Sequence, residues 1–105
     1  MKIEKITEDG ILFDNGKLIY SDHFQSCCEN NYADFKQLDD LGRDYDFEED
    51  LRFEKVDGYG FRFGDKHRMF FIPCYSEQNG YYSDEVEIYY NGSKVLELCA
   101  EVRLY

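Results

Sequence analysis

Apolar and polar residues alternate along much of the chain, which is the period of a half-buried β-strand. The clearest example surrounds Asn15-Gly16, a dipeptide that favours the tight turn of a hairpin. A two-residue loop there would pair Phe13 with Leu18 and Ile11 with Tyr20. Because both faces of this hairpin carry apolar residues, we expect it to lie near the middle of a sheet.

The middle of the chain continues in the same pattern. Residues 51–54 and 59–64 alternate on either side of Asp57-Gly58, which predicts a second hairpin. Residues 68–75 form a further apolar strand. Pro73 should place that strand at an edge or a bulge, because proline cannot donate a ladder hydrogen bond.

The final two strands require an irregular connection. A two-residue turn at positions 91–92 would mix polar with apolar residues on one face of the hairpin. Extending the loop by one residue instead pairs Ile88 with Leu96 and Val86 with Leu98. We therefore predict a three-residue loop or a bulge between these strands.

One segment shows the period of a helix. Ser26 and Glu29 match a capping box, in which each side chain accepts a hydrogen bond from the other residue's main-chain amide. The apolar residues that follow recur at helical spacing, at positions 28, 32, 35 and 38. This pattern predicts a helix over residues 27–41, ended by Gly42.

These elements together predict an α+β fold. It would be mainly an antiparallel β-sheet of about seven to eight strands, with one α-helix packed on the sheet. No internal repeat, linker or low-complexity tract divides the chain, so we expect a single domain over residues 1–105.

Charge changes the functional expectations more than the fold. The chain has 12 Lys and Arg against 23 Asp and Glu, a formal net charge of −11. Such a field repels nucleic-acid phosphates, so direct nucleic-acid binding is not expected, whereas a basic protein surface would be attracted. The sequence shows neither a membrane span nor a signal peptide, which predicts a cytoplasmic location.

The acidic residues are densest in the middle of the chain. A candidate interaction surface comprises Asp39, Asp40, Asp44, Asp46, Glu48, Glu49 and Asp50. The run lacks the glycine turn and the final bidentate glutamate of an EF-hand, so calcium is not expected there. Two interpretations stay open: the carboxylates only solvate this face, or they dock a basic partner.

The stretch at residues 21–29 is the candidate for chemistry. A thiol at Cys27, the first position of the predicted helix, would have a lowered pKa, and His23 lies near enough in sequence to act as its base. Only generic residues are present to complete a catalytic set. The sequence therefore favours the alternative, in which the thiols here are core and incidental residues.

A metal site is a further alternative. His23, Cys27, His67 and Cys74 could supply mixed nitrogen and sulfur ligands to zinc. Structural zinc sites bring paired ligands two to four residues apart, and this chain has no CxxC pair. We therefore predict no cofactor and no bound metal.

Two short motifs carry a resemblance. The segment at residues 23–29, His-Phe-Gln-Ser-Cys-Cys-Glu, and the downstream segment at residues 79–83, Asn-Gly-Tyr-Tyr-Ser, resemble a group of small uncharacterised bacterial and phage proteins. Their shared pattern is His-x-Gln-Asp-Cys-Cys-Glu followed by Asn-Gly-Tyr-Tyr-Ser. This chain has Ser26 where that pattern has Asp, and both residues are good helix N-caps. The resemblance implies a bacterial or mobile-element setting and no particular activity.

The leading hypothesis is therefore a non-enzymatic, acidic protein-interaction module, motivated by the net charge and the incomplete catalytic set. The alternatives are a cysteine-dependent enzyme that uses Cys27 with His23, and a zinc-binding protein. The partner, the substrate and the oligomeric state are not predicted by the sequence.

Overall fold

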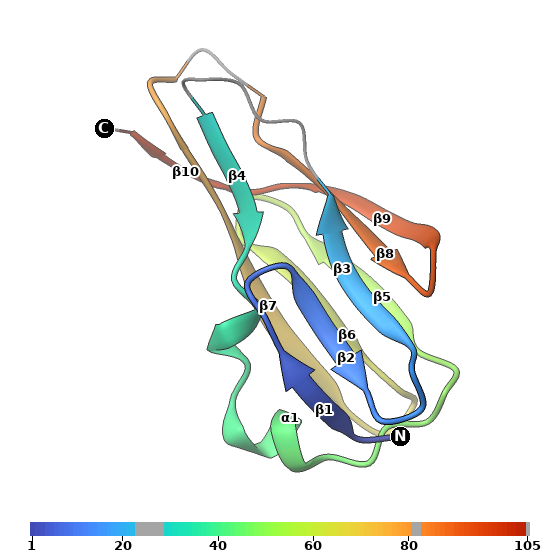
Figure 1. The fold of residues 1–105 in the computed structure, drawn as a ribbon. Coiled ribbons are helices and arrows are strands. Elements are labelled where there is room, and N and C mark those ends of the chain that lie inside the picture. The colour runs from blue at the N-terminus through green and yellow to red at the C-terminus, as the bar shows by residue number, and fades with distance from the viewer. Residues whose placement is uncertain (23–28, 81–82, 105) are drawn as a thin grey trace.

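The computed structural model describes residues 1–22, 29–80 and 83–104. In these residues it contains ten strands, a 3-10 turn and one short α-helix, arranged as two sheets (Figure 1). The first sheet has the order β1 (Ile3–Ile6), β2 (Gly10–Phe13), β3 (Leu18–Asp22), β8 (Glu85–Tyr90) and β9 (Ser93–Cys99). All of its pairs are antiparallel. The mainly antiparallel fold class predicted from the sequence is confirmed.

The second sheet is organised on the long strand β7 (Met69–Gln78). Its order is β10 (Glu101–Leu104), β7, β6 (Gly60–Gly64) and β5 (Arg52–Val56), and β4 (Glu29–Ala33) also pairs with β7. The pair of β10 with β7 is parallel, and the other pairs of this sheet are antiparallel. The chain passes from one sheet to the other at Ala100, between β9 and β10.

The core lies between the two sheets. Figure 1 shows β1 and β2 in front of β7 and β6. Fully buried side chains from both sheets form one cluster, which includes Ile11, Phe13, Ile19, Phe61, Phe63, Ile72, Val86 and Ile88. In β8 the buried Val86 and Ile88 alternate with more exposed residues, as a sheet with one solvent-exposed face requires, whereas residues 72–76 of β7 are all buried.

The first hairpin is present, but its register differs by one residue from the prediction. Ile11 pairs with Ile19, and the Phe13 amide donates to the Lys17 carbonyl over 2.9 Å. The loop is therefore three residues long, and Gly16 takes a positive φ of 87° in it. This register places Ile11 and Ile19 together in the core, which the predicted pairing would not have done.

The predicted register of the last hairpin is confirmed. Ile88 pairs with Leu96 and Val86 with Leu98, and the register shifts between Ile88 and Tyr89. This irregularity keeps the apolar residues of β8 and β9 on one face, as the pattern required.

Pro73 lies where β7 changes partners. It is the last β7 residue paired with β6, opposite Gly60, while the next residue, Cys74, begins the pairing with β4 opposite Ala33. Strand β7 lies between β6 and β10 in the second sheet, and its pairing with β6 is regular up to Pro73, so the edge or bulge predicted for this strand is wrong. The missing amide donor of proline is tolerated because it falls between two ladders.

The helix predicted over residues 27–41 is wrong. Within that range the described residues form strand β4, then a 3-10 turn η1 (Phe35–Gln37), and only afterwards the short helix α1 (Asp40–Asp44). Gly42, the predicted helix stop, is buried inside α1. The capping Ser26 lies outside the described residues, and Glu29 is the first residue of a strand.

The physical reason is the burial of alternate residues. Asn31, Ala33 and Phe35 are almost fully buried, a period of two, whereas Tyr32 faces the other side of the sheet and pairs with Tyr75. Because Asn31 is polar, the sequence does not show this period of two as an alternation of apolar and polar residues. The helical spacing of the apolar residues is therefore the more visible pattern. No described helix is long and apolar enough to span a membrane.

Candidate functional site

The acidic segment, residues 39–50, begins at α1. The Asp39 side chain accepts a hydrogen bond from the Gly42 amide over 2.7 Å and so caps the helix. The Arg43 guanidinium donates to the main-chain carbonyls of Leu38 and Lys36, at 3.2 and 3.0 Å. These bonds fix the start of the segment and leave the side chains of Asp40 and Asp44 exposed.

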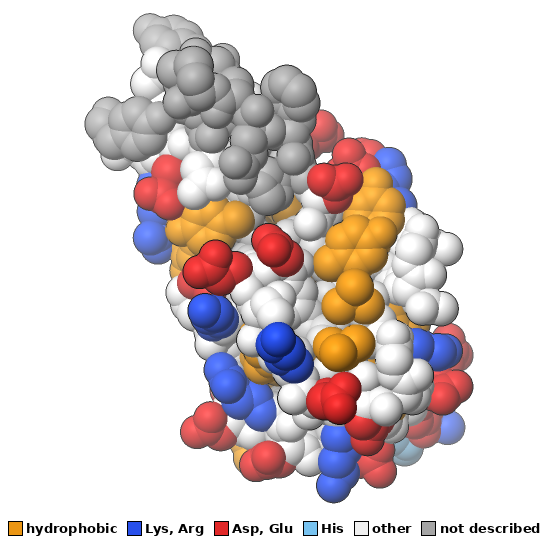
Figure 2. Space-filling view, viewed as in Figure 1, with side chains coloured by type: hydrophobic (Ala, Val, Ile, Leu, Met, Phe, Trp, Pro, Cys, Tyr) orange, Lys and Arg blue, Asp and Glu red, His pale blue; other side chains and the backbone are white. Residues whose placement is uncertain are grey.

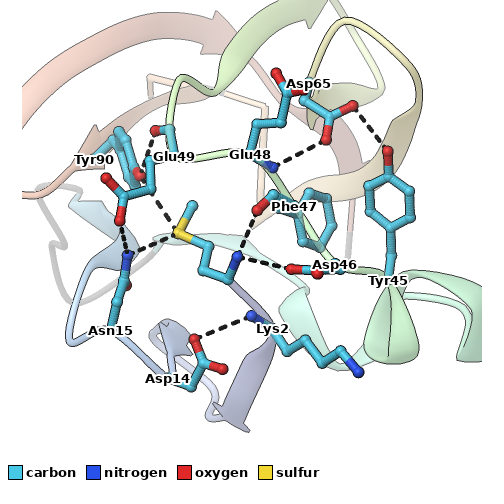
Figure 3. Close-up of polar contacts among 11 residues, drawn as sticks. Lys2, Asp14, Asn15, Tyr45, Asp46, Phe47, Glu48, Glu49, Asp65 and Tyr90 are labelled. Carbon is cyan, nitrogen blue, oxygen red and sulfur yellow. Dashed lines mark hydrogen bonds and ion pairs between the residues drawn. The ribbon is translucent and has the colours of Figure 1, made fainter.

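Asp65 holds the middle of the acidic segment from outside it. Only 2% of Asp65 is exposed, in the turn between β6 and β7. Its carboxylate accepts from the Tyr45 hydroxyl at 2.9 Å and from the Glu48 amide at 3.1 Å (Figure 3). It also accepts from the amides of His67 and Arg68 within its own turn. One buried carboxylate thus ties the acidic segment to the second sheet.

Hydrogen bonding decides the protonation of this carboxyl. Burial alone would raise the pKa of Asp65, but the amides of Glu48, His67 and Arg68 and the Tyr45 hydroxyl all donate to the ionised form. Together they hold the pKa of Asp65 below its ordinary value of 3.8. Asp65 is therefore ionised at neutral pH despite its burial.

The first residue of the chain holds the segment from the opposite sheet. The Met1 ammonium donates to Asp46 Oδ1 at 2.9 Å and to the Phe47 carbonyl at 2.6 Å, and the Phe47 amide donates back to the Met1 carbonyl. Figure 3 shows the two bonds that reach Asp46 and the Phe47 carbonyl. The hydrogen bond and the charge of the ammonium lower the pKa of Asp46.

The end of the segment is attached to the first sheet. Asn15 donates to the Glu49 carboxylate at 3.1 Å, and the Tyr90 hydroxyl donates to the Glu49 carbonyl at 3.0 Å. Lys17 lies 3.7 Å from the same carboxylate. Burial, with the neighbouring carboxylates of Glu49 and Asp50, raises the pKa of Tyr90 to about 12.

Aromatic side chains anchor the same segment in the core. Phe47 is 2% exposed, and its ring lies 5.4 Å from the rings of both Phe63 and Phe70 and 4.7 Å from that of Tyr45. Aromatic pairs at such separations stabilise the packing beyond the area they bury. The acidic segment is thus an ordered segment that packs against one end of the molecule.

All seven predicted surface carboxylates are exposed. Asp46, Glu48 and Glu49 each pair with a cationic group of the described chain. The other four make no ion pair with any residue that the structure describes; they are Asp39, Asp40, Asp44 and Asp50. Leu41, between two of them on α1, is 61% exposed. Figure 2 shows acidic and basic side chains mixed at this lower end of the molecule.

A groove of about 440 Å³ lies beside η1. It is lined by Glu8, Asp9, Asn30, Tyr32, Ala33, Asp34, Lys36 and Glu77. Burial and a hydrogen bond to Glu77 raise the pKa of Tyr32, and Lys36 lies 3.9 Å from Glu8. With four carboxylates and one lysine, this groove suits a cationic group better than an apolar ligand.

The candidate catalytic and metal-binding residues fall in different places. His23 and Cys27 lie outside the described residues. His67 is exposed in the turn after β6, with its Nε2 atom 3.3 Å from Glu48 Oε1, whereas Cys74 is fully buried in the core. Burial raises the pKa of the Cys74 thiol to about 12. Among the residues that the structure describes, no three His, Cys, Asp or Glu side chains are grouped to hold a metal ion.

Sequence reasoning missed a buried polar network. The Asn31 side chain donates to the Ser83 carbonyl at 2.8 Å, and the Ser76 hydroxyl donates to Asn31 Oδ1. Gln78 Nε2 donates to Ser76 Oγ at 2.7 Å. All three side chains are at most 2% exposed. No sequence signal marks Asn31 as buried, whereas Gly64-Asp65 before a lysine could have indicated the turn that Asp65 organises.

Comparison with protein-family models, with curated proteins and with solved structures gives no match for this chain. The resemblance in the motifs at residues 23–29 and 79–83 therefore stays a prediction. Function has to be inferred from the geometry and the charge of the described residues.

Proposed function

We propose that this protein is a non-enzymatic interaction module that docks a basic protein surface on the acidic segment, residues 39–50. The observation that supports this most directly is the combination of exposed charge with fixed main chain. Four carboxylates lack an ion-pair partner in the described chain, while Asp65, Met1 and Phe47 hold the segment that bears them.

A fixed acidic surface favours binding for two reasons. Its main chain is already ordered, so less conformational entropy is lost when a partner binds. The net charge of −11 also attracts a basic surface over a longer distance and raises the association rate. Leu41, 61% exposed beside Asp40 and Asp44, supplies an apolar contact within the charged surface.

Titration with hexalysine tests the proposal, followed by NMR of the main-chain amides and by calorimetry. We expect the amide shifts to concentrate in residues 39–50. The double variant Asp40→Asn/Asp44→Asn should bind hexalysine about three- to tenfold more weakly, because it removes two exposed charge contacts. Binding should weaken further as salt is added.

The matched control is Glu4→Gln/Glu85→Gln, which makes the same change in net charge at exposed positions outside the acidic segment. We expect it to keep nearly the affinity of the unmodified chain. Shifts spread evenly over the surface, or equal losses in the two double variants, would show that only the net charge matters and would contradict the proposal.

A further inference from the structure

Strand β10 is an exposed edge of the second sheet. In the part of the chain that the structure describes it pairs with β7 alone, in parallel register from Glu101 opposite Tyr75 to Leu104 opposite Gln78. The Arg103 guanidinium lies 3.9 Å from the centre of the Tyr75 ring and holds the strand against β7. Three of its four residues are exposed.

The hydrogen bonds of β7 show which of its residues face each neighbour. The Asp34 amide donates to the Pro73 carbonyl, at the end of the ladder with β4. The next residue, Cys74, donates its amide to Tyr59 on the opposite side. Because successive residues of a strand bond to alternate sides, the even-numbered residues of β7 face away from β4 and toward β10.

This alternation determines which main-chain groups of β10 are free to pair. In a parallel ladder, a residue bonds to the two neighbours of the residue opposite it. Ser76, opposite Val102, therefore bonds to Glu101 and Arg103. The N–H and C=O groups of Val102 and Leu104 face outward, away from β7.

The side chains of these two residues are also exposed, Val102 at 42% and Leu104 at 68%. An edge strand that combines outward main-chain groups with exposed apolar side chains is a template for pairing with another strand. The occupant must then present a complementary strand.

We propose that β10 pairs antiparallel with β10 of a second copy of this chain, about a two-fold axis at Val102. This register sets the outward groups of Val102 opposite those of the second copy's Val102. It also sets Glu101 opposite Arg103 in both halves of the pair, and opposite charges across strands stabilise a sheet. The register centred on Arg103 would oppose two arginines and is disfavoured. The charge pattern of β10 is thus complementary to itself.

We expect the dimer formed through β10 to be weak. Four-residue strands bury less area than the 1,200 Å² or so of a stable interface. Each copy also carries a net charge of −11, and this repulsion is screened by salt. Dimer formation should therefore increase with protein concentration and with salt, whereas the docking of hexalysine should weaken with salt.

Analytical ultracentrifugation from about 10 μM to about 1 mM tests the pairing, over the range where a weak dimer forms. The unmodified chain should show a concentration-dependent dimer. Glu101→Arg and Arg103→Glu each oppose like charges and should weaken the dimer about tenfold or more. Val102→Pro removes an outward donor without removing a bond to β7, and it should sediment as a monomer.

Mixing supplies the control. An equimolar mixture of Glu101→Arg with Arg103→Glu places a basic strand opposite an acidic one and should dimerise again, although one variant lacks the stacking on Tyr75. The double variant Glu101→Arg/Arg103→Glu should also dimerise. A monomer at every concentration of the unmodified chain, or a mixture no more dimeric than its components, would overturn the proposal. These residues lie outside the acidic segment, so either proposal can fail alone.

Discussion

Asp65 connects two segments of this molecule that are distant in the sequence. Its carboxylate accepts four hydrogen bonds, two within its own turn and two from the acidic segment some twenty residues earlier. A buried carboxylate is tolerated only when such donors satisfy it. Its role is structural: it supports the surface on which the proposed docking takes place.

At this scale we expect Asp65→Asn to lower the free energy of unfolding by about 2–3 kcal/mol at neutral pH, because an amide cannot accept all four bonds. The pKa of Asp65 is lower in the folded state than in the unfolded state, where it is about 4. The stabilisation from the ionised carboxylate is therefore fully present at pH values above the unfolded-state pKa, and it is lost as the pH falls through the folded-state pKa. Urea unfolding of both proteins between pH 3 and pH 7 checks this. The control is Asp40→Asn, a change at an exposed position, which should alter the free energy of unfolding by less than about 0.5 kcal/mol. If the difference in stability between Asp65→Asn and the unmodified chain were the same at every pH, the proposed role of the ionised Asp65 carboxylate would be contradicted.

At the scale of elements, β4 shows how a polar side chain specifies a strand. Asn31 faces the core side of β4 and finds its partners on two other segments, Ser76 on β7 and the carbonyl of Ser83. The long strand β7 then serves as the common neighbour of β4, β6 and β10. Pairing with β7, rather than local helical preference, decides the structure of residues 29–33.

Asn31→Ala should destabilise the protein by about 1–3 kcal/mol, because the buried Ser76 hydroxyl loses its acceptor and the Ser83 carbonyl loses one of its two side-chain donors. Ser76→Ala should do the same. A double-mutant cycle by chemical unfolding measures their coupling, and we expect the double variant to lose less than the sum of the two single losses. Strict additivity would show that the two side chains do not stabilise β4 together.

At the scale of the whole molecule, the net charge sets the response to salt. A charge of −11 on 105 residues destabilises the folded chain through repulsion, and the described ion pairs are largely exposed and individually weak. The acidic segment adds local repulsion among the four of its carboxylates that make no ion pair with any residue the structure describes.

We therefore expect the melting temperature to rise between low and moderate sodium chloride, as screening removes more repulsion than attraction. Thermal unfolding followed by circular dichroism measures it. Asp40→Asn/Asp44→Asn should melt higher than the unmodified chain at low salt, and the two should converge as salt is added. A melting temperature that falls with salt would show that the ion pairs dominate.

The sequence by itself determined the class of fold and the character of the surface. Strict alternation predicts strands wherever one face is wet, and the requirement that Ile88 and Val86 share a face with Leu96 and Leu98 was enough to predict the register of the last hairpin. The exposed position of the seven carboxylates in the acidic segment followed from the cost of burying a charge.

Only the tertiary structure decided what becomes of residues 27–41 and of the acidic segment. The sequence of residues 27–41 fits a helix as well as it fits a strand with one buried asparagine. The strand is possible because Ser76, which is distant in the sequence, hydrogen-bonds Asn31, and a polar side chain is buried only where it finds such a partner. The bond between Asp65 and the Glu48 amide is likewise invisible in a linear pattern. Local signals determine which residues can face the core, whereas long-range hydrogen bonds select among the arrangements that this allows.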